Sequence, residues 1–318
     1  YVGSHACKAL AAAGYEPVVF DNLSAGHDWA VKWGVLEQGD LLDRDRIAEV
    51  VAAYQPAGAI HFASFAYVGE SVIDPGKYWR NNVAGAINLC DALVAADTDA
   101  IVFSSSCTVY GRTDAAFISE AEPVLPINPY GNTKRAIEIM LADYEVATGM
   151  RNTILRYFNA AGDDADGEIG EDHDPETHLI PLAIAAAARD SDALKIFGTD
   201  YPTPDGTCIR DYIHVTDLAD AHVRAVRRML EGGASDVFNL GAGNGYSVRD
   251  VIDAVGRIVG APVTATEDAR RPGDPARLVA DIAHAQRGLD WQPVHSSLDN
   301  IVSTAWNWYR AHRSAGRA

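Results

Sequence analysis

The sequence has few basic residues and no long apolar run. Its 26 lysines and arginines stand against 44 acidic residues, for a formal net charge of −18. Such a balance repels phosphate backbones and anionic lipid surfaces, so we expect no nonspecific binding to nucleic acid or to membranes. No run of 18 apolar residues is present, and residues 1–14 lack the pattern of a secretory signal peptide. Any anionic ligand must therefore be held by a few local donors.

Cysteine is also scarce. The four cysteines are widely spaced and form no Cys-x-x-Cys pair; they are Cys7, Cys90, Cys107 and Cys208. This spacing predicts neither a disulfide framework nor a zinc site, and we expect no bound metal. Free thiols are typical of a reducing compartment, so the sequence predicts a cytoplasmic protein.

The apolar residues that are present follow an alternating pattern. They make up 48% of the 318 residues, enough for a large core. Expected strands are 17–20, 34–38, 58–63, 100–106 and 152–158, and expected helices are 43–54, 81–96 and 132–148. Strand and helix in alternation predict an α/β fold, a doubly wound parallel sheet of the Rossmann type with helices on both faces. Ligands of such sheets bind beyond the carboxyl ends of the strands.

The regular alternation of expected strands and helices ends after about residue 160. Residues 160–178 are acidic and glycine-rich without apolar periodicity, which indicates a loop. We expect a dinucleotide-binding domain over 1–160 and a smaller α/β substrate domain over 161–318. The segment 211–231 has the spacing of a strand and a long helix, and we expect it to return to the first domain.

The first letters, "YVGSH", lead directly into a helical pattern. Gly3 lies at the start of this helix, and an acidic residue, Asp21, ends the strand that follows, 18 residues on. This is the back half of a dinucleotide-binding fingerprint. We expect the first strand and first two glycines of the fingerprint to lie upstream of Tyr1, so that the chain as it stands binds a dinucleotide poorly and folds poorly.

The segment "PYGNTK" contains a tyrosine and a lysine whose spacing suits acid/base catalysis. Tyr130 and Lys134 are four apart at the start of a helix, so they share one face. An ammonium close to a tyrosine hydroxyl stabilises the phenolate, and this lowers the pKa of the hydroxyl toward the range of a general base. Ser106 ends the strand 100–106, where its hydroxyl could bind the same substrate oxygen. Together the three predict a catalytic site.

These motifs resemble a known family from end to end. The segments "DNLS", "HFASFAYVGESV", "FSSSCTVYG", "PYGNTK", "DYPTPDGTCIRDYIHV" and "RRPGDPA" are similar to those of the extended short-chain dehydrogenases/reductases, and within them the UDP-hexose 4-epimerases. The resemblance implies an isomerase that uses NAD and interconverts UDP-glucose and UDP-galactose. Tyr130, with Lys134 and Ser106, would remove the proton of the 4-hydroxyl during oxidation at carbon 4. The tethered 4-keto sugar would then rotate and be reduced on its other face.

The resemblance also implies a set of cofactor contacts. Asp21 would bind the adenosine ribose, and its charge favours NAD over NADP. Ala66 is a departure, because some members carry a lysine there that reaches the cofactor. The implied cofactor-binding residues are Gly3, Asp21, Asn22, Asp40, Leu41, Phe62, Ala63, Asn81, Ser104, Tyr130, Lys134, Tyr157 and Phe158.

A second implied set binds the UDP-sugar. Arg210 and Arg271 match two arginines that clamp the diphosphate, a task that suits guanidinium forks. Leu278 matches a gatekeeper position, and its intermediate size predicts a preference for sugars that are not N-acetylated. The implied substrate-binding residues are Ser106, Asn159, His178 (asparagine in some members), Leu179, Phe197, Arg210, Arg271, Asp274 (to the uridine ribose) and Leu278.

Other functions stay open on the sequence. A UDP-pentose or UDP-uronate 4-epimerase would differ only in what the sugar carries at carbon 5. A nucleotide-sugar dehydratase usually has Asp and Glu directly after the strand-end hydroxyl, where this chain has Cys107 and Thr108. A noncatalytic NAD-sensing module would not need Tyr130 and Lys134. The resemblance further implies a homodimer formed through helices over 81–96 and 132–147.

Overall fold

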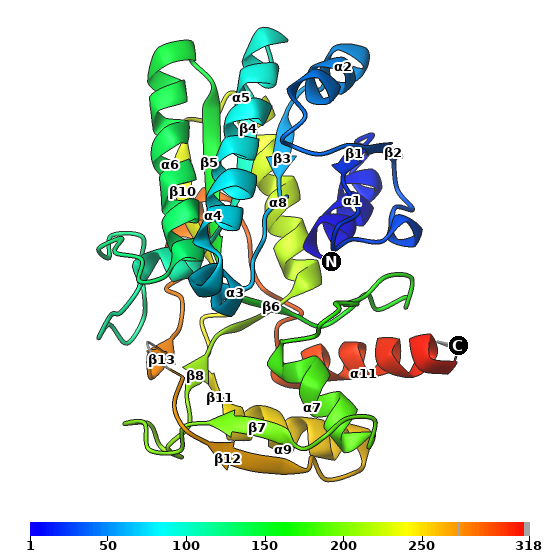
Figure 1. Cartoon of the computed structure of the whole chain (residues 1–318), viewed down its shortest axis with the longest axis vertical. Helices are drawn as coiled ribbons and strands as arrows, with labels where there is room; N and C mark the ends of the chain where they lie inside the picture. The colour runs from blue at the N-terminus through cyan, green and yellow to red at the C-terminus, as the bar shows by residue number, and fades with distance from the viewer. Residues whose placement is uncertain (272–273, 315–318) are drawn as a thin grey trace.

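A four-stranded parallel sheet forms the centre of the upper part of the molecule (Figure 1). The computed structural model describes residues 1–271 and 274–314. The strand order is β10-β5-β4-β3, with every neighbouring pair parallel. These strands are β3 (Ala59–His61), β4 (Ala100–Ser106), β5 (Arg151–Tyr157) and β10 (Asp236–Leu240). The predicted α/β fold with a parallel sheet is confirmed.

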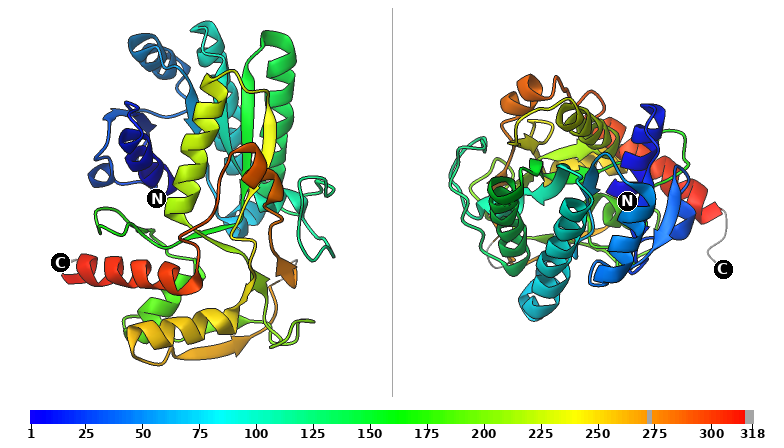
Figure 2. Two further views of the ribbon diagram at one scale, coloured as in Figure 1. Left: turned by 180° about the vertical axis from the view of Figure 1, so that it is seen from behind. Right: turned by 90° about the horizontal axis from the view of Figure 1, so that it is seen from above.

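Both faces of this sheet are buried, as its continuous apolar strands require. In β4, Ile101 and Phe103 pack into one core and Ala100 and Val102 into another. The first core is shared with α2 (Arg44–Tyr54), α5 (Gly85–Ala95) and α6 (Pro129–Thr148), and the second with α8 (Val215–Leu230) and α10 (Ala283–Gly288). Figure 2 shows α8 lying along the sheet on the side away from α5 and α6.

The N-terminal segment forms α1 (Val2–Ala12) and a parallel pair, β1 (Val18–Asp21) with β2 (Val35–Gln38). Helix α1 packs against α8. Among the described residues, no strand pairs with the outer edge of β1 or with the outer edge of β3. The first strand of the fingerprint stays a prediction.

The lower part of the molecule is built from short strands and three helices around a core of its own (Figure 1). β7 (Leu194–Phe197) pairs with β12 (Ala265–Asp268), while β8 (Ile209–Arg210) lies between β11 (Tyr246–Ser247) and β13 (Arg277–Leu278). The helices are α7 (Leu179–Ala187), α9 (Val248–Val259) and α11 (Leu298–Ser314).

The two parts are joined by a parallel strand pair. β6 (Asn159–Ala161) pairs with β9 (Tyr212–His214), which leads into α8 on the upper sheet. β10 belongs to the upper sheet too, although it lies beyond residue 231. Shorter pieces are η1 (Asp28–Ala30), α3 (Val68–Ile73), α4 (Pro75–Tyr78), a π-helical η2 (Trp79–Ala84) and η3 (Cys107–Tyr110). No helix among the described residues has the length and apolar content needed to cross a bilayer.

Candidate active site

The three predicted catalytic residues lie together at the carboxyl edge of the upper sheet. Ser106 is the last residue of β4, and Tyr130 and Lys134 lie in the first two turns of α6. The helix begins there because Asn128 caps it, accepting the amide hydrogen of Gly131 at 2.8 Å. The Lys134 ammonium donates to the carbonyl of residue 104 at 2.8 Å and lies 5.7 Å from the centre of the Tyr130 ring.

Burial dominates the electrostatics of this group. It raises the pKa of the Tyr130 hydroxyl well above its usual value, and the hydrogen bond with Ser106 opposes this only in part. It also lowers the pKa of the Lys134 ammonium to about 7. Lys134 therefore does not by itself bring the tyrosine into the range of a general base, so further positive charge is needed for a phenolate at neutral pH.

The ends of α1, β1 and β2 bring together residues that suit a dinucleotide. The first turn of α1 has no acidic side chain, so the helix itself places no carboxylate at the positive end of its dipole. Asp21 ends β1 and accepts the amide hydrogen of Leu23 at 2.7 Å, while Asn22 donates to Asp40 at 2.9 Å. A Cβ on Gly3 would lie 3.5 Å from the Phe62 ring, an ordinary contact. Packing against that ring therefore does not require glycine, and the fit to a diphosphate rests on the helix end.

Other predicted cofactor residues line the same edge or the core behind it. Phe62 and Ala63 directly follow β3, and the side chain of Ser104 in β4 contacts the His222 ring at 3.0 Å. Asn81, in η2, donates to its neighbour Asn82 at 2.9 Å. Three more residues lie in or against the hydrophobic cores, namely Leu41, Tyr157 and Phe158. Their packing alone accounts for their apolar character, so their contact with a cofactor stays a prediction.

The predicted substrate residues of the lower part meet around β8. Arg210 lies in β8, and the neighbouring strand β13 pairs Leu278 with it in register. The Arg210 guanidinium forms an ion pair with the carboxylate of Asp274. Arg271 lies with its guanidinium carbon 4.0 Å from the centre of the Phe197 ring. The two predicted arginine clamps are thus each engaged by another predicted substrate residue.

A cleft of about 670 Å³ opens beside these residues. It is lined by residues 112–116, 270, 271 and 274–277, which include four arginines. Guanidinium groups in a chain of strong negative charge are the local donors that an anionic ligand needs. Pro272 and Gly273 of the "RRPGD" motif lie outside the described residues.

Three predicted substrate residues remain, namely Asn159 in β6 and His178 and Leu179 at the start of α7. The Asn159 amide donates to the backbone carbonyl of Asp211 at 3.1 Å. Leu179 begins α7, and His178 is the residue before it. Ion pairs with Glu171 and Glu176 engage Nδ1 of His178 at 2.8 and 2.9 Å, so only its other ring nitrogen remains for a substrate.

Sequence reasoning missed two buried acidic groups that position the site. The Asp211 carboxylate accepts backbone amide hydrogens of residues 242, 243 and 280 at 2.7–3.1 Å, which ties the loop after β10 and the loop after β13 to β8. Glu138, four residues after Lys134 in α6, accepts two bonds from Arg156 at 2.7 and 2.8 Å and one from Ser105 at 2.7 Å. The four-residue spacing was a usable signal for Glu138, whereas nothing local marks Asp211.

Comparison with known proteins agrees with this geometry. The sequence model of the NAD dependent epimerase/dehydratase family matches residues 1–241. The chain belongs to this family. It is 52% identical over 316 residues to a UDP-glucose 4-epimerase of Rhizobium meliloti (strain 1021), covering 99% of this chain and 96% of that protein.

Two solved structures extend the likeness to three dimensions. UDP-glucose 4-epimerase from Brucella ovis in complex with NAD has a TM-score of 0.95 and 54% identity, covering 96% of this chain and 94% of that one. The enzyme from Bifidobacterium longum in complex with NAD+ and UDP has a TM-score of 0.94 and 33% identity, covering 99% and 97%. The resemblance drawn from the motifs is therefore confirmed at the level of sequence and fold.

Proposed function

We propose that this chain is an NAD-dependent UDP-glucose 4-epimerase, which interconverts UDP-glucose and UDP-galactose. The observation that carries the proposal is the meeting of Ser106, Tyr130 and Lys134 at the carboxyl end of β4, in a chain 52% identical to a UDP-glucose 4-epimerase. Bound NAD supplies a reversible hydride acceptor and a positive charge.

The chain's own residues account for the proton and the binding. Tyr130 takes the proton of the sugar 4-hydroxyl and returns it after the sugar has turned, while Ser106 holds the same oxygen. Lys134 keeps the tyrosine oxygen in reach and stabilises its charge. Arg210 and Arg271 hold the diphosphate, so the hexose stays tethered yet free to rotate.

Two residues separate this proposal from a dehydratase. Cys107 and Thr108 occupy the positions where an acid and base would drive loss of water. Burial raises the pKa of the Cys107 thiol, so it stays protonated. Cys107 and Thr108 cannot serve as the acid and the base of a dehydration, and this supports epimerisation.

A single assay tests the proposal. Purified full-length protein, with added NAD, is incubated with UDP-galactose, and UDP-glucose formation is followed. We expect turnover without net consumption of NAD. Tight NAD binding with no turnover would instead support the sensing module, and turnover of only UDP-pentoses or UDP-uronates would support those epimerases.

The substrate range is proposed from Leu278. Leu278 pairs in register with Arg210 across β13 and β8, and it packs against a buried core that includes Cys107 and Phe158. We expect kcat/KM for UDP-glucose to exceed that for UDP-N-acetylglucosamine, and Leu278→Ala to narrow the gap by about tenfold, because a pocket contact of this size is worth about 1–3 kcal/mol. Equal efficiency of the wild type on both sugars would contradict the gatekeeper role.

We further propose a cytoplasmic homodimer. The four cysteines are unpaired thiols and three are buried, which supports a reducing compartment. Exposed apolar side chains on α5 and α6 support a subunit contact there; they are Ile87, Ile139 and Val146. Mass measurement in solution tests the dimer, and Ile139→Glu is expected to weaken it.

A further inference from the structure

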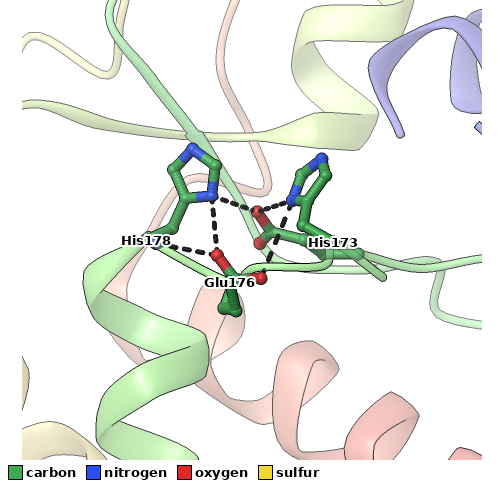
Figure 3. A group of neighbouring side chains, drawn as sticks. His173, Glu176 and His178 are labelled. Carbon is green, nitrogen blue, oxygen red and sulfur yellow. Dashed lines mark hydrogen bonds and ion pairs between the residues drawn. The ribbon is translucent and has the colours of Figure 1, made fainter. Parts of the chain in front are cut away.

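A compact group of histidines and glutamates lies in the loop between β6 and α7. It consists of Glu171, His173, Glu176 and His178, four residues within a span of eight. Each offers one nitrogen or oxygen atom, and these atoms all lie within 4.8 Å of one another. Figure 3 shows His173 and His178 with one ring nitrogen each turned toward the carboxylates between them.

The central contact of this group does not have the geometry of a hydrogen bond. Oε1 of Glu171 lies 2.8 Å from Nδ1 of His178 and 3.1 Å from Nδ1 of His173. Yet Oε1 of Glu171 and Nδ1 of His173 are both buried with no hydrogen-bond partner, and the Glu171 side chain is only 5% exposed. Both atoms face an ion-pair partner, but neither has an aligned hydrogen bond, so a ligand that both atoms share would satisfy them better.

We propose that Glu171, His173, Glu176 and His178 bind one divalent transition-metal ion, Zn²⁺ by preference. Two imidazole nitrogens and two carboxylate oxygens form a four-ligand set that suits this ion. Ligands about 2.1 Å from a tetrahedral ion are about 3.4 Å apart. The nitrogen–oxygen distances here, 2.8–3.7 Å, bracket that value. Glu171 and His173 do not align as a hydrogen bond, whereas Nδ1 of His178 and Oε1 of Glu176 do, at 2.9 Å.

A second acidic group in the same loop shows what an ordinary ion-paired cluster looks like. Asp164, Asp166 and Glu168 surround the ammonium of Lys8, which contacts each carboxylate at 2.7–2.8 Å. There the cation is a side chain, and no further ion is needed. The histidine group differs because its ion pairs involve imidazole nitrogens, which in the neutral form can bind a metal, whereas an ammonium has no lone pair to offer.

The surroundings hold the proposed ligands in place. Backbone amides of Thr177 and His178 donate to Oε1 of Glu176 at 2.6 and 2.7 Å. The backbone of Glu171 is held at both ends, since its amide donates to Asp163 at 2.6 Å and its carbonyl accepts from the Trp308 indole at 3.1 Å. Such outer contacts orient metal ligands.

The ion would have a structural role. All four ligands come from the protein, so the site has no open position for a substrate or water. Through His178 it would tie the acidic loop to the start of α7. None of its ligands takes part in the proton transfer, but His178 is also a predicted substrate residue, so metal binding is measured separately from turnover and the variants avoid His178.

The test uses the full-length chain, purified without a histidine tag. The protein is stripped with a chelator, dialysed against Zn²⁺ or Co²⁺, and freed of excess metal. We expect about one equivalent of metal per chain by elemental analysis, the visible absorption of tetrahedral Co²⁺, and a higher unfolding temperature with Zn²⁺ than without it. None of these readouts measures turnover, so failure here is distinct from failure of the proposed function.

Variants locate the ion. Glu171→Gln and His173→Gln each remove a ligand, and we expect each to weaken Zn²⁺ binding by at least about 100-fold, the upper end of what outer contacts alone contribute. His27→Gln is the control, since His27 contacts the same loop at residue 172, outside the group. Wild-type protein that takes up no stoichiometric metal, or metal binding that both ligand variants retain, would overturn the proposal. The wild-type measurements decide the question even if a variant does not fold.

Discussion

The predicted catalytic group and the predicted substrate-binding group are built in different ways. Ser106, Tyr130 and Lys134 come from one strand end and one helix, both anchored in a sheet that is buried on two faces. The substrate group around Arg210 comes from two-residue strands and loops, held together by ion pairs and by the buried Asp211 carboxylate. The comparison indicates that the predicted catalytic residues lie on long regular elements, which Glu138 braces, whereas the predicted binding residues lie on short strands and loops that long-range polar contacts hold together.

The largest effect is expected from Tyr130→Phe. Loss of the hydroxyl removes the proposed acid/base, so turnover of UDP-galactose should fall by about 10²–10⁴-fold. The fold should persist, because the ring stays packed. Steady-state kinetics with a thermal unfolding curve measure both. Tyr144→Phe, on the same helix, is the matched control, and a Tyr130→Phe enzyme within tenfold of wild type would refute the phenolate role.

Glu138→Ala should lower the stability of the protein through the upper part, without removing a group proposed for the chemistry. Its side chain is 1% exposed and pairs with Arg156, which is 4% exposed, so the variant leaves a buried guanidinium unpaired. We expect a loss of about 3–5 kcal/mol in the free energy of unfolding. Chemical denaturation measures it. In the lower part, Asp299→Ala removes an exposed ion pair with Arg257 and should cost less than about 1 kcal/mol. Similar losses in the two variants would remove the contrast.

Arg210→Ala should weaken binding more than chemistry. A charge-assisted bond of about 1.5–3 kcal/mol is lost, so KM for the UDP-sugar should rise by about 10–100-fold with a smaller change in kcat. Arg249→Ala is the control, since that exposed arginine pairs with Glu267 away from the cleft. A fall in kcat with unchanged KM would assign Arg210 to the chemical step instead.

The smallest effect concerns acid stability of the upper part. Burial lowers the pKa of His222 to about 4, although its bond to the carbonyl of Leu218 opposes this. Below the unfolded value of 6.5 the unfolded chain binds a proton that the folded chain does not, so the free energy of unfolding falls as the pH drops from 6.5 toward 4. At pH 5 the loss from this residue is about 2 kcal/mol.

Denaturation of wild type and His222→Gln at pH 7 and pH 5 measures this term. The variant should lose less stability between the two pH values than the wild type does. An unchanged slope in His222→Gln would show that other groups govern acid stability.

Several parts of the molecule could be predicted from sequence because they depend on local spacing. The expected strands 100–106 and 152–158 and the expected helix 132–148 agree with β4, β5 and α6. The four-residue spacing of Tyr130 and Lys134 determines that they share a helix face. The electrostatic outcome could not be predicted in this way. Burial raises the pKa of Tyr130 against the expected effect of Lys134, because desolvation depends on everything packed around the group.

The histidine and glutamate group is the opposite case. Its four residues are close in sequence, but they lie in a loop, where no helix or strand period predicts which side chains converge. The expectation of no metal rested on cysteine spacing, and this group contains no cysteine.

Apolar periodicity predicted the α/β class, the motifs predicted the family by resemblance, and residue spacing predicted the trio Ser106, Tyr130 and Lys134, because all three signals can be read from a few residues at a time. Only the tertiary structure decided that Arg210 pairs with Asp274, 64 residues away, and that Asp211 binds amides of two distant loops. It also decided that the side chains of Glu171 and His173 meet in a buried position. The contacts of Arg210 and Asp211 depend on the closure of long chain segments around the cores, and nothing within either partner's local sequence specifies them.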